Sequence, residues 1–377
     1  MSEETVEKKI ILKEEDDYIV NMGPQHPSTH GVLRLEVCLS GETVNYMIPH
    51  IGYIHRGIEK MAESDTYKQV IHLTDRMDYL SSHINNEAVC LAVEEALGVE
   101  VPERVQYIRA ILDELTRIAS HNLWWSAFGM DLGALTTFFY GMRDREKILS
   151  IFEESFGSRL LHSFNTPGGL LHDVHPDFRK HTLEYVKYFR KKLPDYKNLL
   201  TDNVIFHNRT IGIGVMDKKM AINYGVTGPS GRGSGFSCDI RKAAPYGIYD
   251  KVKFKEILYH EGDSFARYKV RMDEMVESLN ILEQLVDNMP EEGGFTAKMK
   301  PVIKLPEGEY YQRVETARGE LGVYIVSKGA KYPYRIKFRS PNFSNLFVLN
   351  TLSKGGIIAD LVAICGSLDL VIPDIDR

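Results

Sequence analysis

The segment 264–288 constrains the fold most, because its apolar residues recur with the period of an α-helix over its whole length. Asp263 precedes it as the expected N-cap. A second long amphipathic helix is predicted to open at Pro102-Glu103 and to carry apolar residues as far as Ala119. Apolar stripes of this length must be covered by other elements, so the sequence predicts a mainly helical core. The stripe of the first segment consists of Phe265, Tyr268, Met272, Met275, Leu279 and Leu282.

Shorter elements complete the predicted fold. They are helices at 86–97, 143–156 and 176–192, a hairpin of strands 33–39 and 43–48, and a second hairpin of strands 323–326 and 334–338. The first hairpin is recognised by its alternation of apolar and polar residues and by its turn at Ser40-Gly41. Internal repeats and low-complexity linkers are not found in the sequence. We therefore interpret 18–377 as one α+β domain, a mainly helical core with small antiparallel β-sheets at its ends, preceded by a flexible acidic tail at 1–17.

The composition argues against two classes of protein. The chain has 377 residues, a formal net charge of −6 and a pI near 6.1, which argues against binding to a nucleic-acid backbone. No apolar run reaches the roughly 18 residues of a membrane span, and the N-terminal tail lacks the apolar core of a signal peptide. We expect a protein with no transmembrane helix of its own, soluble inside the cell or held at a membrane by other subunits.

The four cysteines are too far apart in the sequence to form close ligand pairs. They are Cys38, Cys90, Cys238 and Cys365. Iron–sulfur and structural zinc sites draw on closely spaced cysteines, so we expect four buried apolar thiols and no metal bound by this chain. If the protein handles electrons, the metal that carries them belongs to another polypeptide.

The stretch 23–31 contains two prolines, two glycines and two histidines ahead of the first hairpin. Such a rigid turn presents His26 and His30 at the mouth of the sheet, either as part of a structural loop or as part of a functional one. The next segment, 49–57, is aromatic and basic and includes Arg56. It is typical of a contact with a partner, although an exposed salt bridge also explains Arg56.

Two further clusters place polar groups among apolar residues. In 75–83 the acids are explained as helix caps, whereas the phenol of Tyr79 can donate a hydrogen bond inside an apolar pocket. Asp131 lies in an apolar aromatic stretch, where a buried carboxylate needs a donor or a cation, either as a core hydrogen-bond hub or in a site. The glycine-rich 228–235 lacks the Lys-Ser/Thr ending of a P-loop and matches a dinucleotide fingerprint poorly.

Taken together, these strings resemble one family, the 49 kDa-type D subunit of the proton-pumping NADH:quinone oxidoreductase, respiratory complex I. The resemblance runs from Gly23 to Arg377 and is carried by the segments 23–31, 49–60, 76–79, 129–136, 315–324 and 367–377. It implies a peripheral protein on the cytoplasmic side of the bacterial inner membrane. It also implies that NAD, FMN and iron–sulfur clusters are bound by partner subunits.

The family is similar to the large subunit of nickel–iron hydrogenases, so the resemblance implies a hydrogenase-like fold. In those enzymes four cysteines, in Arg-x-Cys-x-x-Cys and Asp-Pro-Cys-x-x-Cys motifs, hold the metal. The matching positions here are Asp78, Ser81, Val371 and Asp374. Without soft thiolate ligands a nickel–iron centre cannot be assembled, so hydrogenase activity is excluded. Leu370 stands where the family has proline, which leaves the shape of the last loop open.

The resemblance implies that the emptied metal cavity has become the inner end of a quinone channel. Its catalytic residues carry over to His30, Tyr79 and Asp131, and its quinone-binding residues to His30, Tyr79, His26 and Val371. A phenol and an imidazole can each hydrogen-bond a quinone oxygen and supply a proton during reduction. Asp131 would pair with His30, orient its ring and raise its pKa. We hypothesise that the charge left after proton donation is relayed to the proton pump.

The implied partners are other subunits of complex I. The small B subunit would supply electrons from its terminal iron–sulfur cluster, and Arg56 would pack close to that cluster, where a fixed cation tunes the potential. The C and I subunits, and the H and A subunits within the membrane, are the other expected neighbours.

One departure from the family bears on the quinone. Members that use ubiquinone usually have histidine two residues after the arginine that matches Arg159, and that histidine couples cluster reduction to protonation. Here Leu161 takes this position, and the imidazole is displaced to His162. Loss of a protonatable neighbour should lower the potential of the cluster, which predicts a low-potential quinone such as menaquinone.

Two other interpretations remain open at this point. The chain could serve only as a scaffold that bridges partner subunits. It could also play the quinone-site role in a complex fed by ferredoxin instead of NADH, because the electron-input module is a different polypeptide.

Overall fold

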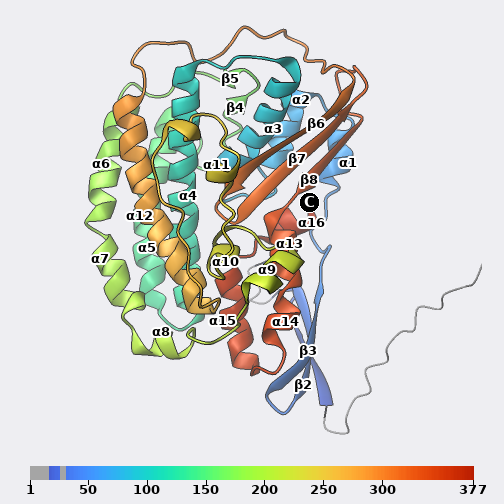
Figure 1. Cartoon of the computed structure of the whole chain (residues 1–377), viewed down its shortest axis with the longest axis vertical. Coiled ribbons are helices and arrows are strands. Elements are labelled where there is room, and N and C mark those ends of the chain that lie inside the picture. The colour runs from blue at the N-terminus through green and yellow to red at the C-terminus, as the bar shows by residue number, and fades with distance from the viewer. Residues whose placement is uncertain (1–16, 26–30) are drawn as a thin grey trace, which may run out of the picture.

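The computed structural model describes residues 17–25 and 31–377. The described residues form a helical bundle flanked by two three-stranded antiparallel sheets (Figure 1). This is the α+β architecture that the sequence predicts. Among the described helices, none combines the length and the apolar composition needed to cross a bilayer.

Four long helices stand side by side and form the bundle (Figure 1). They are α4 (Glu103–Asp131), α5 (Leu135–Phe156), α6 (Phe178–Arg190) and α12 (Ser264–Asn288). The predicted cap of α12 is confirmed, because the carboxylate of Asp263 accepts a hydrogen bond from the backbone N–H of Ala266 at 2.7 Å. The apolar stripe of α12 is buried at Tyr268, Met275, Leu279 and Leu282, and the helix packs against α4 and α6.

The first sheet lies at one end of the molecule, beside α14 (Leu349–Ser353) and α15 (Ile358–Leu368) (Figure 1). It consists of β1 (Asp17–Met22), β2 (Arg34–Ser40) and β3 (Thr43–His50), in that order. The predicted hairpin is β2 and β3, and Gly41 supplies the positive φ of 60° that its turn requires. Asp17, which the sequence assigns to the tail, is the first residue of β1 and pairs with Ser40.

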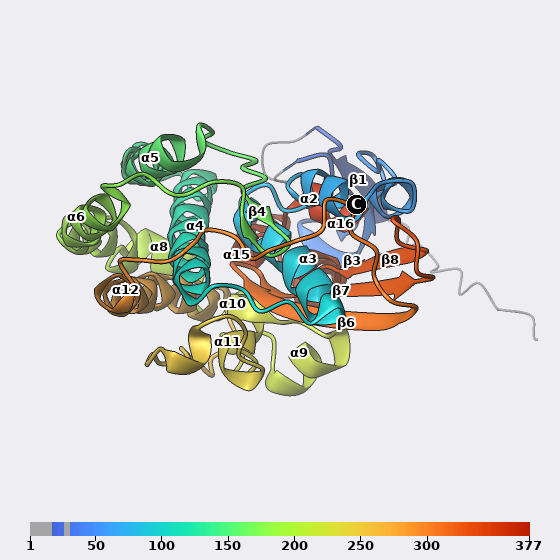
Figure 2. The ribbon, with the colours of Figure 1, turned by 90° about the horizontal axis from the view of Figure 1, so that it is seen from above.

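The second sheet consists of β6 (Gly308–Thr316), β7 (Gly319–Ser327) and β8 (Arg335–Arg339), again in sequence order. The predicted hairpin corresponds to β7 and β8, whereas β6 is not among the predicted strands. Seen from above, α3 (Ser82–Leu97) lies between α4 and the β6–β7 strands, in agreement with its contacts to all three (Figure 2). The position of α3 therefore links the bundle to the sheet.

The remaining elements are short. They are α1 (Ile58–Ala62), α2 (Tyr67–Thr74), α7 (Leu193–Tyr196), α8 (Val204–Asn208), α9 (Lys218–Tyr224), α10 (Gly228–Arg232), α11 (Ile240–Ala243), α13 (Pro341–Phe347), α16 (Ile372–Asp376), a π-helical turn at Lys197–Thr201, a 3₁₀ turn at Tyr249–Lys251, and the two-residue strands β4 (Asn165–Thr166) and β5 (Gly169–Leu170).

Tertiary packing explains why α5 begins earlier than predicted. The sequence predicts a helix from 143, but α5 begins at Leu135 and includes Gly141. A Cβ atom at Gly141 would lie 2.0 Å from Ser126 Oγ and 2.8 Å from the carbonyl oxygen of Asn122. The glycine, which weakens a helix in isolation, is what allows α5 to approach α4 this closely.

The thiols follow the sequence prediction with one exception. Cys38, Cys90 and Cys365 are buried, but Cys238 is only half-buried. Cys238 lies between α10 and α11, where its backbone N–H donates a hydrogen bond to Glu256 at 2.9 Å. This loop lies at the protein surface, so the prediction of a fully buried thiol is wrong at this position.

A buried network of charges joins the bundle to the sheet. The Arg232 guanidinium donates to Glu274 of α12 at 2.8 Å and to Glu315 of β6 at 2.7 Å. Glu274 also lies 3.0 Å from the imidazole of His121 on α4. Burial alone would raise the pKa of Glu274, but Arg232 and His121 hold it well below its ordinary value.

Removal of one charge from this network should destabilise the fold. We expect Glu274→Gln to lower the free energy of unfolding by about 3 kcal/mol, because it leaves buried positive charge uncompensated. Urea unfolding followed by circular dichroism measures the change. The control is Glu291→Gln, which removes an exposed partner of Arg179 and should change stability by less than about 0.5 kcal/mol. Equal losses in the two variants would contradict this role of the network.

Candidate functional site

A cavity of about 240 Å³ opens where distant parts of the chain meet. The segment just before α3 contributes Tyr79 and Leu80, and the C-terminal part of α4 contributes residues up to Asp131. The turn between β6 and β7 contributes Arg318, and the segment between α15 and α16 contributes the rest. The complete lining is Tyr79, Leu80, Leu123, Trp124, Ala127, Met130, Asp131, Arg318, Asp369, Leu370 and Val371.

Tyr79 is the one tyrosine that lines the cavity, and 40% of its surface is exposed. Burial of the rest raises the pKa of Tyr79, and the positive charge of Arg318 offsets part of that effect. The phenol therefore stays protonated at neutral pH. A protonated phenol in a partly apolar cavity can donate a hydrogen bond to a carbonyl oxygen.

Arg318 is the buried cation of the site. Its guanidinium lies 3.1 Å from a carboxylate oxygen of Asp78 and 3.0 Å from one of Asp369, and it donates to Ser120 Oγ at 2.7 Å. Burial raises the pKa of Asp78, and the Arg318 charge offsets part of that effect. The site is thus built around one arginine shared by two carboxylates.

The four positions that match the hydrogenase cysteines lie in the protein interior. Asp374 accepts hydrogen bonds from Ser340 and, at 2.7 Å, from Asn342. The backbone N–H of Val371 donates to the same Asn342 side chain at 3.1 Å. Asp78, Ser81, Val371 and Asp374 are all buried. The side chains at these four positions are two carboxyls, a hydroxyl and an isopropyl group.

The structure brings three of the predicted site residues together. Tyr79, Asp131 and Val371 line the same cavity, although the sequence separates them widely. His26 and His30 lie outside the described residues, so their predicted contacts stay predictions. Asp131 is half-buried at the C-terminal end of α4, not fully buried as its apolar neighbours suggest.

The residues predicted to lie near a partner's cluster are not part of the cavity lining. Arg56 is exposed and donates a hydrogen bond to the carbonyl oxygen of the exposed Arg76 at 2.6 Å. Among the ion pairs of the described part of the chain, none involves Arg56, so the alternative of an exposed salt bridge is not observed there. The exposed Arg56 side chain therefore contacts the backbone of Arg76, which lies three residues before Tyr79.

Leu161 and His162 lie in the loop after α5. Leu161 has a φ of 56°, a left-handed conformation that is strained for leucine. The ring of His162 packs edge-on against Phe152 and Phe156. Burial, with the nearby His83, lowers the pKa of His162 to about 3. This imidazole is therefore neutral at physiological pH.

Sequence reasoning missed Arg318 and Asp369 as members of the site. Both lie in segments that carry the family resemblance, 315–324 and 367–377, but no pattern in the sequence indicates that they pair. Asp369 has a φ of 57°, a conformation that only a few residue types adopt, and it follows the C-terminal end of α15. An aspartate in this position can turn the chain and direct its carboxylate toward Arg318.

Comparisons with known proteins identify the family of the chain. The profile of the family described as "Respiratory-chain NADH dehydrogenase, 49 Kd subunit" matches residues 131–304 and 295–377. The chain belongs to this family of 49 kDa subunits of respiratory-chain NADH dehydrogenases.

Individual relatives cover almost the whole chain. It is 47% identical to the D subunit of the NADH-quinone oxidoreductase of Desulfotalea psychrophila, over 98% of this chain and 99% of the relative. It is 54% identical to the C/D subunit of the NADH-quinone oxidoreductase of Phocaeicola vulgatus, over 99% of this chain and 72% of the relative. The corresponding D subunit from Geobacter metallireducens is 47% identical over 95% of this chain and 98% of its own length.

The site generates a prediction about pH and stability. Burial and the neighbouring Asp78 raise the pKa of Asp374 to about 6. Because the pKa of Asp374 is higher in the folded protein than in the unfolded chain, protonation of this carboxyl stabilises the fold. The stabilisation is complete below the unfolded pKa, near 3.8, and is lost as the pH rises through 6. Relative to the wild type, Asp374→Asn should therefore gain about 2 to 3 kcal/mol of stability between pH 4 and pH 7.

Urea unfolding of both proteins at several pH values measures this gain. Comparison at two pH values cancels the part of the effect that comes from altered hydrogen bonds to Ser340 and Asn342. Asp287→Asn, on the exposed end of α12, is the charge control. A stability difference for Asp374→Asn that stays constant from pH 4 to pH 7 would contradict the prediction.

Proposed function

We propose that the chain is the quinone-site subunit of a proton-translocating NADH:quinone oxidoreductase of the complex I type. The cavity around Tyr79 receives the quinone headgroup, and the quinone is a low-potential one such as menaquinone. The observation that carries this proposal is the cavity itself, where Tyr79, Asp131 and Val371 meet. These are residues that the family resemblance independently assigns to quinone reduction. The names of the relatives, which specify NADH-quinone oxidoreductases, support the same assignment.

The lining suits a quinone headgroup chemically. Leu123, Trp124, Met130 and Val371 supply apolar and aromatic surface for a flat ring. Tyr79 supplies a hydroxyl donor for one of the two carbonyl oxygens. Trp124 is itself fixed, because its indole N–H donates to the carbonyl oxygen of Gly366 at 2.7 Å. A rigid apolar wall with one polar donor orients the ring without binding it covalently.

Reduction of a quinone to a quinol takes two electrons and two protons. The electrons arrive from an iron–sulfur cluster of the neighbouring B subunit, and negative charge develops on the quinone oxygens. The Tyr79 phenol hydrogen-bonds one of these oxygens and donates a proton to it, and His30 serves the other. Asp131 orients the imidazole of His30 in this scheme.

The neighbours and the location belong to the same proposal. The B, C and I subunits, and the H and A subunits within the membrane, surround the chain, which sits peripherally on the cytoplasmic side of the bacterial inner membrane. Arg56 and Arg76 form an exposed basic surface that suits contact with the B subunit. NAD, FMN and the clusters are held by other subunits.

Loss of the Tyr79 hydroxyl should separate electron input from quinone reduction. In the purified complex, Tyr79→Phe is expected to lower quinone reduction about 100-fold, the usual contribution of one general acid. Reduction of the clusters by NADH should be unchanged, because that step does not use the phenol. Stopped-flow spectroscopy of the clusters and a quinol assay measure the two steps.

The matched control is Tyr334→Phe, which removes the hydroxyl of an exposed tyrosine near β8. It should leave both rates within the error of the assay. If Tyr79→Phe kept full turnover, the chain would act as a scaffold only. If reduced ferredoxin but not NADH reduced the clusters, the chain would still be the quinone-site subunit, but the electron donor of the complex would be ferredoxin.

The second part of the proposal, the low-potential quinone, rests on Leu161 and His162. His162 does not replace the missing histidine as a protonatable group, because burial among aromatic rings lowers its pKa to about 3. Electron uptake by the partner's terminal cluster then lacks a coupled proton from this loop. A cluster without that proton has the lower potential that suits menaquinone.

A redox titration tests this part separately. The potential of the terminal cluster should change with pH by much less than the roughly 59 mV per pH unit that accompanies transfer of one electron coupled to one proton. Leu161→His should introduce a pH-dependent slope, whereas Leu160→His, at the exposed neighbour, should not. A steep slope in the wild-type complex would overturn the menaquinone assignment and leave the Tyr79 test unaffected.

A further inference from the structure

Away from the Tyr79 cavity, α3 and α4 bring three potential metal ligands together inside the protein. They are His83 and Glu87 on α3 and Asp113 on α4. One ligand atom from each side chain lies within 4.8 Å of the other two. His83 and Glu87 are four residues apart and so share one face of α3. All three residues are buried.

Each of these side chains has a polar atom without a hydrogen-bond partner in the part of the chain that the structure describes. The atoms are His83 Nε2, Glu87 Oε2 and Asp113 Oδ2. Within the cluster, His83 Nδ1 lies 3.0 Å from Asp113 Oδ1. Buried polar atoms are nearly always paired in folded proteins, so an unpaired atom on each side chain of this cluster points to a ligand.

The protein's own cation does not satisfy the cluster. Arg109 lies close enough to influence it, but its guanidinium is held by the carboxylate of Glu94 at 3.0 and 2.8 Å. It also donates to the carbonyl oxygens of Thr166 and Gly169. His83 Nε2 has no hydrogen-bond partner among the described residues, so this ring nitrogen is available to a ligand.

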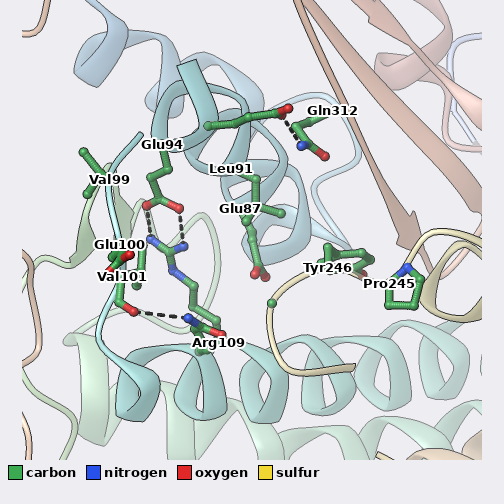
Figure 3. Close-up of a pocket in the computed structure, with 13 residues that line it drawn as sticks. Glu87, Leu91, Glu94, Val99, Glu100, Val101, Arg109, Pro245, Tyr246 and Gln312 are labelled. Carbon is green, nitrogen blue, oxygen red and sulfur yellow. Dashed lines mark hydrogen bonds and ion pairs between the residues drawn. The ribbon is translucent and has the colours of Figure 1, made fainter. Parts of the chain in front are cut away.

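A pocket of about 500 Å³, shown in Figure 3, shares Glu87 with the cluster. Glu87 belongs to both, since it lines the pocket and is one of the three ligands. In Figure 3 the side chain of Glu87 extends from α3 toward the loop that carries Pro245 and Tyr246. Glu95 and Glu100 also line this pocket, together with the Glu94–Arg109 ion pair, and the two carboxylates without a cationic partner raise the local concentration of cations.

We propose that His83, Glu87 and Asp113 form a binding site for a divalent transition-metal ion, for which Zn²⁺ is the representative, entered through the acidic pocket. One imidazole and two carboxylates are a donor set that Zn²⁺ accepts, with water as the fourth ligand. Bonds of about 2.0 to 2.2 Å draw the three side chains slightly closer together than they lie in the structure. The bound ion cross-links α3 to α4.

Zinc binding by the full chain tests the proposal. A chromophoric chelator competes for Zn²⁺ in solution, and elemental analysis after desalting counts the ions retained. We expect the wild type to retain one Zn²⁺ and Glu87→Gln to bind it roughly 100-fold more weakly or worse. Glu100→Gln removes a carboxylate of the same pocket that is not a ligand, and should leave the affinity within about threefold.

A second control addresses binding at the surface. Glu154, His175 and His181 form another group of potential ligands, but Glu154 is exposed and the two histidines are half-buried. His181→Gln should therefore leave the Zn²⁺ ion of the buried site in place. If His181→Gln lost the ion while Glu87→Gln kept it, or if the wild type retained none, the proposal would be overturned.

Thermal unfolding provides a readout that does not depend on counting ions. Zn²⁺ should raise the unfolding midpoint of the wild type and of Glu100→Gln, because an ion that binds only the folded chain stabilises it. Neither Glu87→Gln nor a second ligand variant, Asp113→Asn, should gain this shift, and circular dichroism verifies that each is folded. An equal shift in all four proteins would also overturn the proposal.

Discussion

The buried guanidinium of Arg318 holds together segments that lie far apart in the sequence. It reaches Asp78 before α3, Ser120 on α4 and Asp369 after α15. Asp78 directly precedes Tyr79 in the sequence, and Asp369 directly precedes Leu370. Tyr79 and Leu370 both line the cavity. A buried charge without a partner is very costly, so these three groups must stay together once folding has buried them. The walls of the cavity are fixed as a consequence.

The same arrangement supports the positions that the sequence matches to the hydrogenase cysteines. Cysteine ligands hold a metal by soft donor atoms, whereas carboxylate and hydroxyl groups in the same places need hydrogen bonds or a cation. Asp78 has Arg318, and Asp374 has Ser340 and Asn342. The segments that meet at these positions are thus joined by protein groups alone. The cavity lined by Tyr79, Asp131 and Val371 lies beside them.

The elements are more predictable from the sequence than the site. Helix period and capping chemistry are local, so α12 and its cap at Asp263 follow directly from neighbouring residues. The pairs made by Arg318 span 240 residues to Asp78 and 51 to Asp369, and no local pattern specifies them. The early start of α5 has a similar cause, because it depends on the fit of Gly141 against α4. Tyr79, Asp131 and Val371 are found through resemblance to a family, and the structure adds that they share one cavity.

Two clusters of buried carboxylates lie along the first part of α3, and they differ in one respect. Asp78, just before the helix, shares the internal cation Arg318 with Asp369, whereas Glu87 and Asp113 have unpaired oxygens and Arg109 is held by Glu94. The first cluster has its cation within the chain, whereas the second would take its cation from outside. Because His83 follows Tyr79 by four residues, an ion held there would fasten the first turns of α3 to α4. The mobility of the segment that carries the phenol would then depend on occupancy of a site outside the cavity.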